Sequence, residues 1–297
     1  MSVNQSKSYR AEGGPEAVKV KLRLFAAGCC THPEWVTLQG GSLRSSRIPA
    51  IFACIEHPRL GVILVDTGYS AEFRKETRRL PARLYRWITP VTFEEKDRAV
   101  HQLGACGMTA EQVQSIIITH FHADHIAGLK DFPSARFLYL PEAYDAVKRL
   151  QGLSALRRAF LPGLLPERFE QRSALIDRDR QVKLHADVPF PYALDVLGDG
   201  SLLAVDLPGH ADGQIGLFLS TEQHDYFLCA DAAWSSRAIR ENRPPHAAAE
   251  VIMPSREQYR DSFGRLVELH RCRPELRIVP SHCPEVWANW TAEGGQL

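Results

Sequence analysis

The chain has 297 residues, of which 44% are hydrophobic, so it can bury a sizeable core as one large domain or as two smaller ones. Its 36 lysines and arginines nearly cancel its 35 aspartates and glutamates, which removes any global electrostatic reason to bind nucleic acid or to associate stably with a membrane. No apolar run approaches the length of a membrane span, the N-terminus lacks an apolar signal segment, and the seven cysteines form no Cys-x-x-Cys pair, so we expect a protein of the reducing cytoplasm whose partners are small molecules.

The beginning of the chain predicts strands separated by loops. Residues 1–17 are polar and rich in glycine, which is typical of a flexible N-terminus. Basic and apolar residues then alternate over 18–30, as in a strand with one solvated face, and 31–47 have the composition of a long loop. Two further strands are expected at 48–55 and 62–65, joined by a polar turn.

A basic and aromatic segment, residues 71–89, comes next. Its arginines and lysines alternate with leucines, a tyrosine and Trp87. Such a composition can indicate contact with nucleic acid or with a membrane, but with a net charge near zero we favour a solvated or subunit-facing segment. Residues 92–103 then predict a helix that begins with Thr92 and Glu95 as a capping box.

The stretch from Ser115 to Gly128 joins a hydrophobic strand to a cluster of metal-binding side chains. A run of β-branched residues leads directly into His120, His122, Asp124 and His125. In an extended backbone, side chains two residues apart project to the same side, so His120 and His122 can reach one ion together, while the other two must turn towards a second position. Solvated loop histidines are the alternative, but they do not explain imidazoles and a carboxylate packed behind a buried strand. The stretch therefore predicts a metal site at a strand end.

Residues 141–173 carry leucines and phenylalanines at helical spacing and predict a helical insert. If the insert covers the site as a lid, Phe160 and Leu164 can line an apolar pocket for an acyl chain. If it is a dimer arm instead, the protein is a homodimer. Plain packing onto the core is the alternative interpretation.

The C-terminal half predicts short strands that end near further candidate ligands. One strand leads to Pro208-Gly209-His210, the next ones to Asp231 and the last to His282. Ser255 with Gln258 marks the start of a helix that runs to about Arg271. The expected strands are 192–196, 201–207, 215–220, 226–229 and 276–279.

Five elements of the sequence, taken in chain order, resemble the signature of the metallo-β-lactamase superfamily of hydrolases. The resemblance implies an α+β fold, the four-layer αββα sandwich, with metals in a cleft at one edge of two sheets. It also implies one hydrolase domain over residues 18–297 that contains the insert at about 141–173. The five elements are Val65-Asp66-Thr67-Gly68, His120-x-His122-x-Asp124-His125, Pro208-Gly209-His210, Asp231 and His282.

The resemblance further implies the roles of individual residues. Asp66 would lie beneath the metals and orient a ligand, although a turn-capping aspartate is the alternative. Asp124 would carry a proton to the leaving group. Trp35, on the loop that often overhangs the site in this superfamily, would form a pocket wall, or else would be a tucked tryptophan on a surface loop. The implied ligands are His120, His122 and His210 for one ion, Asp124, His125 and His282 for a second, and Asp231 as a bridge.

Five imidazoles and two carboxylates suit two divalent metal ions, zinc by default, with iron or manganese also compatible.

Differences from particular members of the superfamily narrow the class of substrate. Asp231 stands where zinc β-lactamases of the commonest class have a cysteine, and His122 where the diiron flavoproteins have a carboxylate. Only a short tail follows His282, without the C-terminal helical domain of glyoxalase II.

The chain is most similar to the N-acyl-homoserine lactonases, which implies a hydrolase that opens a lactone ring. These lactonases usually carry a tyrosine three positions after the bridging aspartate, and this chain has Trp234 there. As a candidate catalytic residue, Trp234 can donate a hydrogen bond but cannot act as an acid. An acyl-thioester hydrolase is therefore the alternative, and a phosphodiesterase or a non-catalytic ligand-binding protein fits less well.

Overall fold

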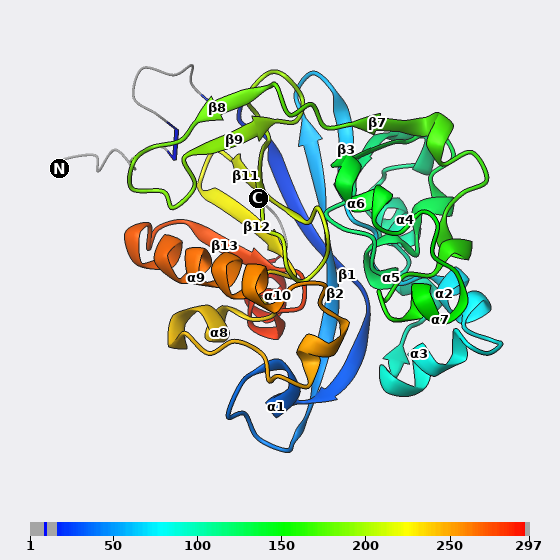
Figure 1. Cartoon of the computed structure of the whole chain (residues 1–297). Helices are drawn as coiled ribbons and strands as arrows, with labels where there is room; N and C mark the ends of the chain where they lie inside the picture. The colour runs from blue at the N-terminus through cyan, green and yellow to red at the C-terminus, as the bar shows by residue number, and fades with distance from the viewer. Residues whose placement is uncertain (1–8, 11–16, 295–297) are drawn as a thin grey trace.

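The computed structural model describes residues 9–10 and 17–294, and two β-sheets form its centre (Figure 1). The larger sheet has the strand order β4-β1-β2-β3-β5-β6-β7, and the smaller sheet has the order β13-β12-β11-β10-β9-β8. The larger sheet contains β1 (Lys21–Pro33), β2 (Ser45–His57), β3 (Gly61–Val65), β4 (Val91–Thr92), β5 (Val113–Ile117), β6 (Arg136–Tyr139) and β7 (Ser173–Leu175). The smaller sheet contains β8 (Gln181–Lys183), β9 (Tyr192–Asp195), β10 (Leu203–Asp206), β11 (Ile215–Ser220), β12 (Asp225–Ala230) and β13 (Arg277–Pro280).

Helical segments cover the outer faces of both sheets (Figure 1). Those between β3 and β7 lie on the side of the larger sheet, and α8 and α9 lie on the side of the smaller one. The α-helices are α1 (Glu34–Thr37), α2 (Ala71–Glu76), α3 (Arg83–Ile88), α4 (Ala99–Ala105), α5 (Ala123–Ile126), α6 (Pro141–Asp145), α7 (Gly152–Leu156), α8 (Ser236–Glu241), α9 (Arg256–Cys272) and α10 (Pro284–Ala292). The short 3₁₀ turns are η1 (Glu95–Asp97), η2 (Ala110–Gln112), η3 (Leu129–Asp131), η4 (Pro162–Leu164), η5 (Glu170–Arg172) and η6 (Ala249–Ile252).

Three buried hydrophobic clusters separate four layers. Side chains alternate between the two faces of a strand, so neighbouring residues of β5 serve different clusters: Ile116 packs under the helices and Ile117 packs between the sheets. In β11, Leu217 packs between the sheets while Phe218 packs under α9. Because both faces of the central strands are covered, β11 and β12 are buried along almost their whole length. The αββα sandwich expected from the sequence is confirmed.

The central strand pairings explain why β3 and β5 end at the same edge of the larger sheet. β3 pairs with β5 in parallel, and β5 pairs in parallel with β6. In the smaller sheet β12 pairs in parallel with β13. The carboxyl ends of parallel neighbours meet at one edge, so residues that follow them can converge.

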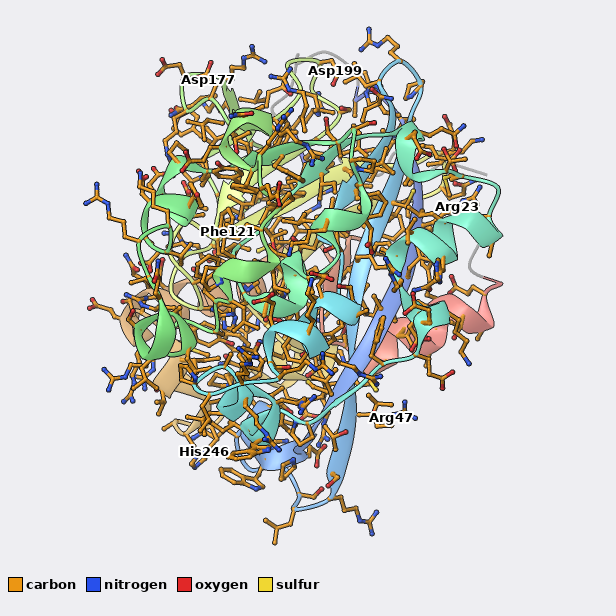
Figure 2. All side chains as sticks on the ribbon, turned by 90° about the vertical axis from the view of Figure 1, so that its right-hand side faces the viewer. Arg23, Arg47, Phe121, Asp177, Asp199 and His246 are labelled. Carbon is orange, nitrogen blue, oxygen red and sulfur yellow. The ribbon has the colours of Figure 1, made fainter. Side chains whose placement is uncertain are left out.

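The predicted helical insert at 141–173 consists of short pieces rather than long helices. It contains α6, α7, η4 and η5 and then leads into β7. Its aromatic side chains pack onto the larger sheet: the Phe169 ring stacks on Phe137 with centroids 5.0 Å apart, and the Phe160 ring lies 6.5 Å from that of Phe121. Figure 2, which labels Phe121, faces this side of the molecule.

Two other expectations differ from the structure. The helix predicted at 92–103 is wrong in its first half, because Thr92 pairs with Cys29 in a two-residue strand and α4 begins only at Ala99. Of the predicted flexible N-terminus, residues 1–8 and 11–16 lie outside the described part of the chain. Tyr9 within it is buried and stacks on Phe218 with ring centroids 5.0 Å apart.

The helix predicted from Ser255 is confirmed, since the Ser255 side chain accepts from Gln258 N and α9 follows. No helix in residues 9–10 and 17–294 has the length and apolar character needed to cross a membrane.

Candidate metal centre

Asp66 and Thr67 fix the loop that follows β5. Asp66 Oδ1 accepts from the Thr119 backbone N–H at 2.9 Å, and Oδ2 accepts from the Thr119 hydroxyl at 2.8 Å. Thr67 donates its hydroxyl proton to the His125 carbonyl at 2.9 Å and accepts from Gly128 N at 3.0 Å. The loop therefore takes its shape from the neighbouring strand end rather than from its own sequence.

The backbone at this strand end is unusual. Asp66 has a φ of 60°, which is uncommon for a residue other than glycine. Gly68 has a φ of 63°, and a Cβ there would lie 2.4 Å from the Cβ of Ala27. Glycine is therefore required on both grounds, and the Asp-Thr-Gly order of the sequence has a structural reason.

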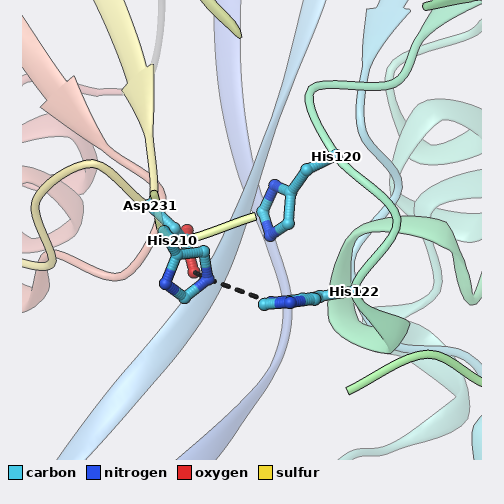
Figure 3. A group of neighbouring side chains, drawn as sticks. All are labelled: His120, His122, His210 and Asp231. Atoms are coloured by element: carbon cyan, nitrogen blue, oxygen red, sulfur yellow. Dashed lines mark hydrogen bonds and ion pairs between the residues drawn. The ribbon is translucent and has the colours of Figure 1, made fainter. Parts of the chain in front are cut away.

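The first ligand group combines both sheets. His120 and His122 come from the loop after β5, whereas His210 follows β10 and Asp231 follows β12. One ligand atom from each of these four buried residues lies within 4.8 Å of all the others (Figure 3). His210 Nε2 lies 2.9 Å from His122 Nδ1 and 3.1 Å from Asp231 Oδ2. Nitrogen and oxygen atoms that converge in this way from two sheets can surround one cation.

The second ligand group lies directly beside the first. It contains Asp124 and His125 from α5 and His282 after β13, again with their ligand atoms within 4.8 Å of one another. Asp231 Oδ1 lies 3.3 Å from His125 Nε2, and Asp231 Oδ2 lies 3.1 Å from His282 Nε2. The Asp231 carboxylate thus faces both groups.

Outer hydrogen bonds orient three of the imidazoles. His125 Nδ1 lies 2.7 Å from Asp66 Oδ2, and His282 Nδ1 lies 2.8 Å from the Pro49 carbonyl oxygen. His120 Nδ1 lies 3.1 Å from the hydroxyl of Thr119. A partner on Nδ1 fixes the ring and leaves Nε2 to face the centre. The role of Pro49 could not be predicted from the sequence, because it contributes a backbone carbonyl, which every residue has.

Several polar atoms at the centre are buried and lack a hydrogen-bond partner among the described residues. They include Nε2 of His120, and also Nε2 of His125 and Oδ1 of Asp231, which lie 3.3 Å apart but form no hydrogen bond. Buried polar atoms without partners are costly and rare in folded proteins. Their convergence fits residues that are completed by metal ions.

The electrostatics agree with this fit. Burial holds the pKa of both His120 and His122 well below the ordinary value, so each offers a nitrogen lone pair at neutral pH. Burial alone would lower the pKa of His125, but the carboxylates of Asp231, Asp66 and Asp124 raise it to about 10. The position thus attracts positive charge, and a bound cation would displace that proton.

Burial would raise the pKa of both carboxylates at the centre, but neighbouring histidines outweigh it. Asp231 is held well below the ordinary carboxyl pKa, chiefly by His282, His125 and His210. His125 and His282 lower the pKa of Asp124 to about 2. Both carboxylates are therefore ionised at neutral pH and available as ligands.

Trp234 lies beside this centre. Its ring is edge-on to His210 with centroids 5.7 Å apart, and its indole N–H is buried without a partner among the described residues. Trp234 and His282 line a cavity of about 190 Å³ together with Leu38, Ile48 and Pro284. Glu34, Arg237 and Glu285 line it as well, so the cavity offers both apolar and charged contacts to a bound group. The cavity residues of β2 carry no sequence signal and were not predicted, whereas those of α1 belong to the loop that the resemblance implied over the site.

Of the three residues expected in the substrate pocket, two lie in the core, and Trp35 lies in α1, whose Glu34 and Thr37 line the cavity. Trp35 is half-buried and packs edge-on against His246 at 4.9 Å between ring centroids. Phe160 and Leu164 are 1% and 0% exposed and belong to the core under the helices. Neither offers surface that a substrate could touch, because the insert packs onto the larger sheet. The expectation that Phe160 and Leu164 line a substrate pocket is therefore wrong, and both are core residues.

The sequence profile of the metallo-β-lactamase superfamily matches residues 55–282. A probable metallo-hydrolase of Mycobacterium tuberculosis, Rv2300c, is 28% identical over 239 residues, which cover 76% of this chain and 72% of that protein. The N-acyl homoserine lactonase AttM of Azorhizobium caulinodans is 26% identical over 284 residues, covering 93% and 98% of the two chains.

Solved structures share the fold. An N-acyl homoserine lactone hydrolase, with the product N-hexanoyl-L-homoserine at its catalytic metal center, superimposes with a TM-score of 0.67 at 21% identity. That comparison covers 92% of this chain and 97% of the other. AidC, a dizinc quorum-quenching lactonase, gives a TM-score of 0.63 at 14% identity, covering 91% and 90%.

Proposed function

Since the chain belongs to the metallo-β-lactamase superfamily, we propose that it is a dinuclear hydrolase that opens acyl lactones, with N-acyl-homoserine lactones as the first candidates. That it is a metal-dependent hydrolase of ester-type bonds follows from the family and its lactonase relatives. The observation that carries the finer proposal is the pair of adjacent ligand groups that share Asp231.

Two divalent ions held by these groups would supply a hydroxide nucleophile and polarise the scissile carbonyl. We propose zinc, because an imidazole-rich set with two carboxylates suits it, and iron or manganese are the alternatives. None of the seven ligands is a serine or a cysteine that could act as a nucleophile. The side chains would instead hold the ions, orient the substrate and move protons.

Asp124 is the proposed proton carrier. One of its oxygens, Oδ2, lies 3.3 Å from His282 Nε2, and a carboxylate has a second oxygen that can take a proton and deliver it to the departing alkoxide. The side chain is 12% exposed, which is enough for contact with a substrate. Asp66 acts through His125 and is a positioning residue.

Trp234 is the proposed donor to the substrate carbonyl oxygen. Its buried indole N–H has no partner in the described part of the chain, and a donor aimed at developing negative charge lowers the barrier to attack. The second candidate is an acyl-thioester hydrolase, in which the Trp234 ring would only form the wall of the cavity beside His282.

All seven cysteines are free, which supports the proposal that the protein works in a reducing cytoplasm.

A hydrolysis panel on metal-loaded protein tests the proposal. Homoserine lactones with different acyl chains, simple γ- and δ-lactones, acyl thioesters and a phosphodiester would be compared by kcat/KM. We expect the acyl lactones to be the best substrates. A thioester that exceeds every lactone would replace the proposal by the second candidate, and elemental analysis that gives one ion or fewer per chain would remove the dinuclear site.

A further inference from the structure

A short segment before and within α3 exposes large apolar side chains next to arginines. Leu80 is 64% exposed, Trp87 58% and Ile88 71%. We call this surface the α3 patch; it consists of Leu80, Trp87 and Ile88 with the exposed Arg78, Arg79 and Arg83. Large apolar residues that are this exposed and this close in sequence are unusual on a folded protein and mark a contact surface.

The geometry of α3 separates an inner from an outer face. Ala82 and Tyr85, three residues apart, pack against the core under the larger sheet. Trp87 and Ile88 point the other way, and the guanidinium of Arg83 lies over the Trp87 ring at 5.1 Å from its centroid. α3 therefore presents an apolar edge flanked by cations, with its core-facing side already occupied.

The neighbouring helix extends the same surface. A Cβ on Gly152, the first residue of α7, would lie 3.9 Å from Pro81, so α7 begins beside the segment that carries Leu80. The next residue, Leu153, is 59% exposed. Both helices lie at the right-hand edge of the molecule in Figure 1, the side that Figure 2 faces.

The charges of this surface are all of one sign. Residues 77–92 contain four arginines and no aspartate or glutamate. In the described part of the chain the guanidinium groups of Arg78, Arg79 and Arg83 have no carboxylate partner, unlike those of Arg98 and Arg178, which pair with Asp131 and Asp206. A net charge of +1 for the whole protein thus conceals a local excess of positive charge.

We propose that the α3 patch docks the protein peripherally onto an anionic membrane surface. Tryptophan, isoleucine and leucine enter the interfacial region of a bilayer, and the arginines meet the anionic headgroups. The charge complements an anionic surface and disfavours a second copy, because a two-fold dimer through this patch would set arginines against arginines. The exposed Ile88 and Leu80 argue against nucleic acid as the partner, because nucleic acids are bound through cationic and aromatic side chains and not through aliphatic ones.

The position of the patch suits an enzyme whose substrates are amphiphilic. On the inner face of α3, Tyr85 packs against the buried cluster that also contains Phe121 and Ala123 of the ligand-bearing loop, so this helix connects the α3 patch to the region of the metal centre. This match to amphiphilic substrates rests on the proposed function, whereas docking itself needs no substrate.

Vesicle co-sedimentation of the full chain tests the proposal. The vesicles would contain phosphatidylcholine alone or phosphatidylcholine with phosphatidylglycerol. We expect binding to the anionic vesicles only, weakening at high salt. Arg79→Gln with Arg83→Gln should lower the partition coefficient about 30-fold, since each arginine near an anionic surface contributes roughly fivefold. Trp87→Ala with Ile88→Ala should lower it at least about tenfold by removing inserted apolar surface.

Matched controls lie elsewhere on the surface. Leu43 and Val251 are 85% and 75% exposed, so Leu43→Ala with Val251→Ala controls for lost apolar surface. Arg136→Gln with Arg271→Gln controls for lost charge, as both arginines are exposed. Thermal unfolding confirms that each variant folds. Both controls should bind like the unmodified protein.

Three results would overturn the proposal. The first is absence of binding to anionic vesicles at low salt, or equal losses in the control variants. The second is a dimer, seen by light scattering, that becomes monomeric in the Trp87→Ala, Ile88→Ala variant, because a second copy would then cover the patch. The third is binding of a single-stranded RNA probe that depends on the arginines but not on Ile88. Hydrolase activity plays no part in these outcomes, so they stay separate from a failure of the proposed function.

Discussion

Asp66→Asn should weaken metal binding through the tautomer of one histidine. Asp66 Oδ2 now faces both His125 Nδ1, at 2.7 Å, and the Thr119 hydroxyl, at 2.8 Å. In the variant, Oδ1 can still accept from Thr119 N, so the amide nitrogen takes the place of Oδ2. An amide N–H₂ cannot accept from Nδ1–H, and His125 would move its proton to Nε2, the atom that faces the centre.

The expected loss follows from how outer partners act on metal ligands. Replacing such a partner typically lowers metal affinity 10- to 100-fold, which corresponds to about 1.4 to 2.7 kcal/mol. The loss should fall on one of the two ions, because the first group keeps His120, His122, His210 and Asp231. Competition with a chromophoric chelator resolves the two affinities.

Thr67→Val is the matched control. It removes the two hydrogen bonds that Thr67 makes to the same loop but touches no imidazole nitrogen. We expect it to cost on the order of 1–3 kcal/mol in the free energy of unfolding, for the Gly128 N–H left unsatisfied, with little change in metal affinity. Equal metal affinities in Asp66→Asn and the unmodified protein would refute the reasoning, and so would an equal loss in Thr67→Val.

Four further expectations concern the centre and its surroundings. Asp124→Asn should keep much of the metal and lose about 10²- to 10⁴-fold in kcat, measured at saturating lactone, because an amide can coordinate but cannot carry a proton. In metal-free protein, the pKa of His125 is about 10 in the folded state against an ordinary 6.5. Its contribution to stability is therefore present below pH 6.5 and is lost as the pH rises through 10. Thermal unfolding at several pH values should show an unfolding temperature that falls over this range in metal-free protein and not in metal-loaded protein. Phe160→Ala should cost about 3–5 kcal/mol in urea unfolding and leave the acyl-chain preference unchanged, since the ring lies in the core; a selective loss of long-chain substrates would restore its pocket role. Trp234→Tyr should preserve or raise lactone turnover, since a phenol also donates a hydrogen bond; a collapse of the lactone rate with an intact thioester rate would favour the thioesterase.

The ligands could be predicted because their chemistry is carried by side chains in a fixed order. His120, His122, Asp124 and His125 are an unusual combination after a buried strand, and the strand itself is visible as an apolar run. The four-layer fold followed from the resemblance that these motifs carry. Composition alone could not give it, because strands buried on both faces have no alternating pattern.

What the sequence could not show depends on distant contacts. Phe160 has the same apolar character in a lid as in a core, and only its packing near Phe121 decides between them. The acceptor for His282 Nδ1 is the Pro49 carbonyl, a group present in every residue. Thr92 looks like a helix cap, but pairing with Cys29 places it in a strand. The near-zero net charge also concealed the α3 patch, because charge summed over a chain carries no information about its distribution.

Each ligand group takes residues from both sheets, and this has a consequence for how the molecule holds together. His120 and His122 belong to the loop after β5 of the larger sheet, and their companions His210 and Asp231 follow strands of the smaller sheet. The larger sheet alone, or the smaller one alone, presents an incomplete coordination sphere. Bound ions would therefore cross-link two halves of the chain. Chelation would then weaken the contact between the sheets as well as stop turnover. Two separately produced halves, divided between β7 and β8, would then reassemble more tightly when the metal is supplied.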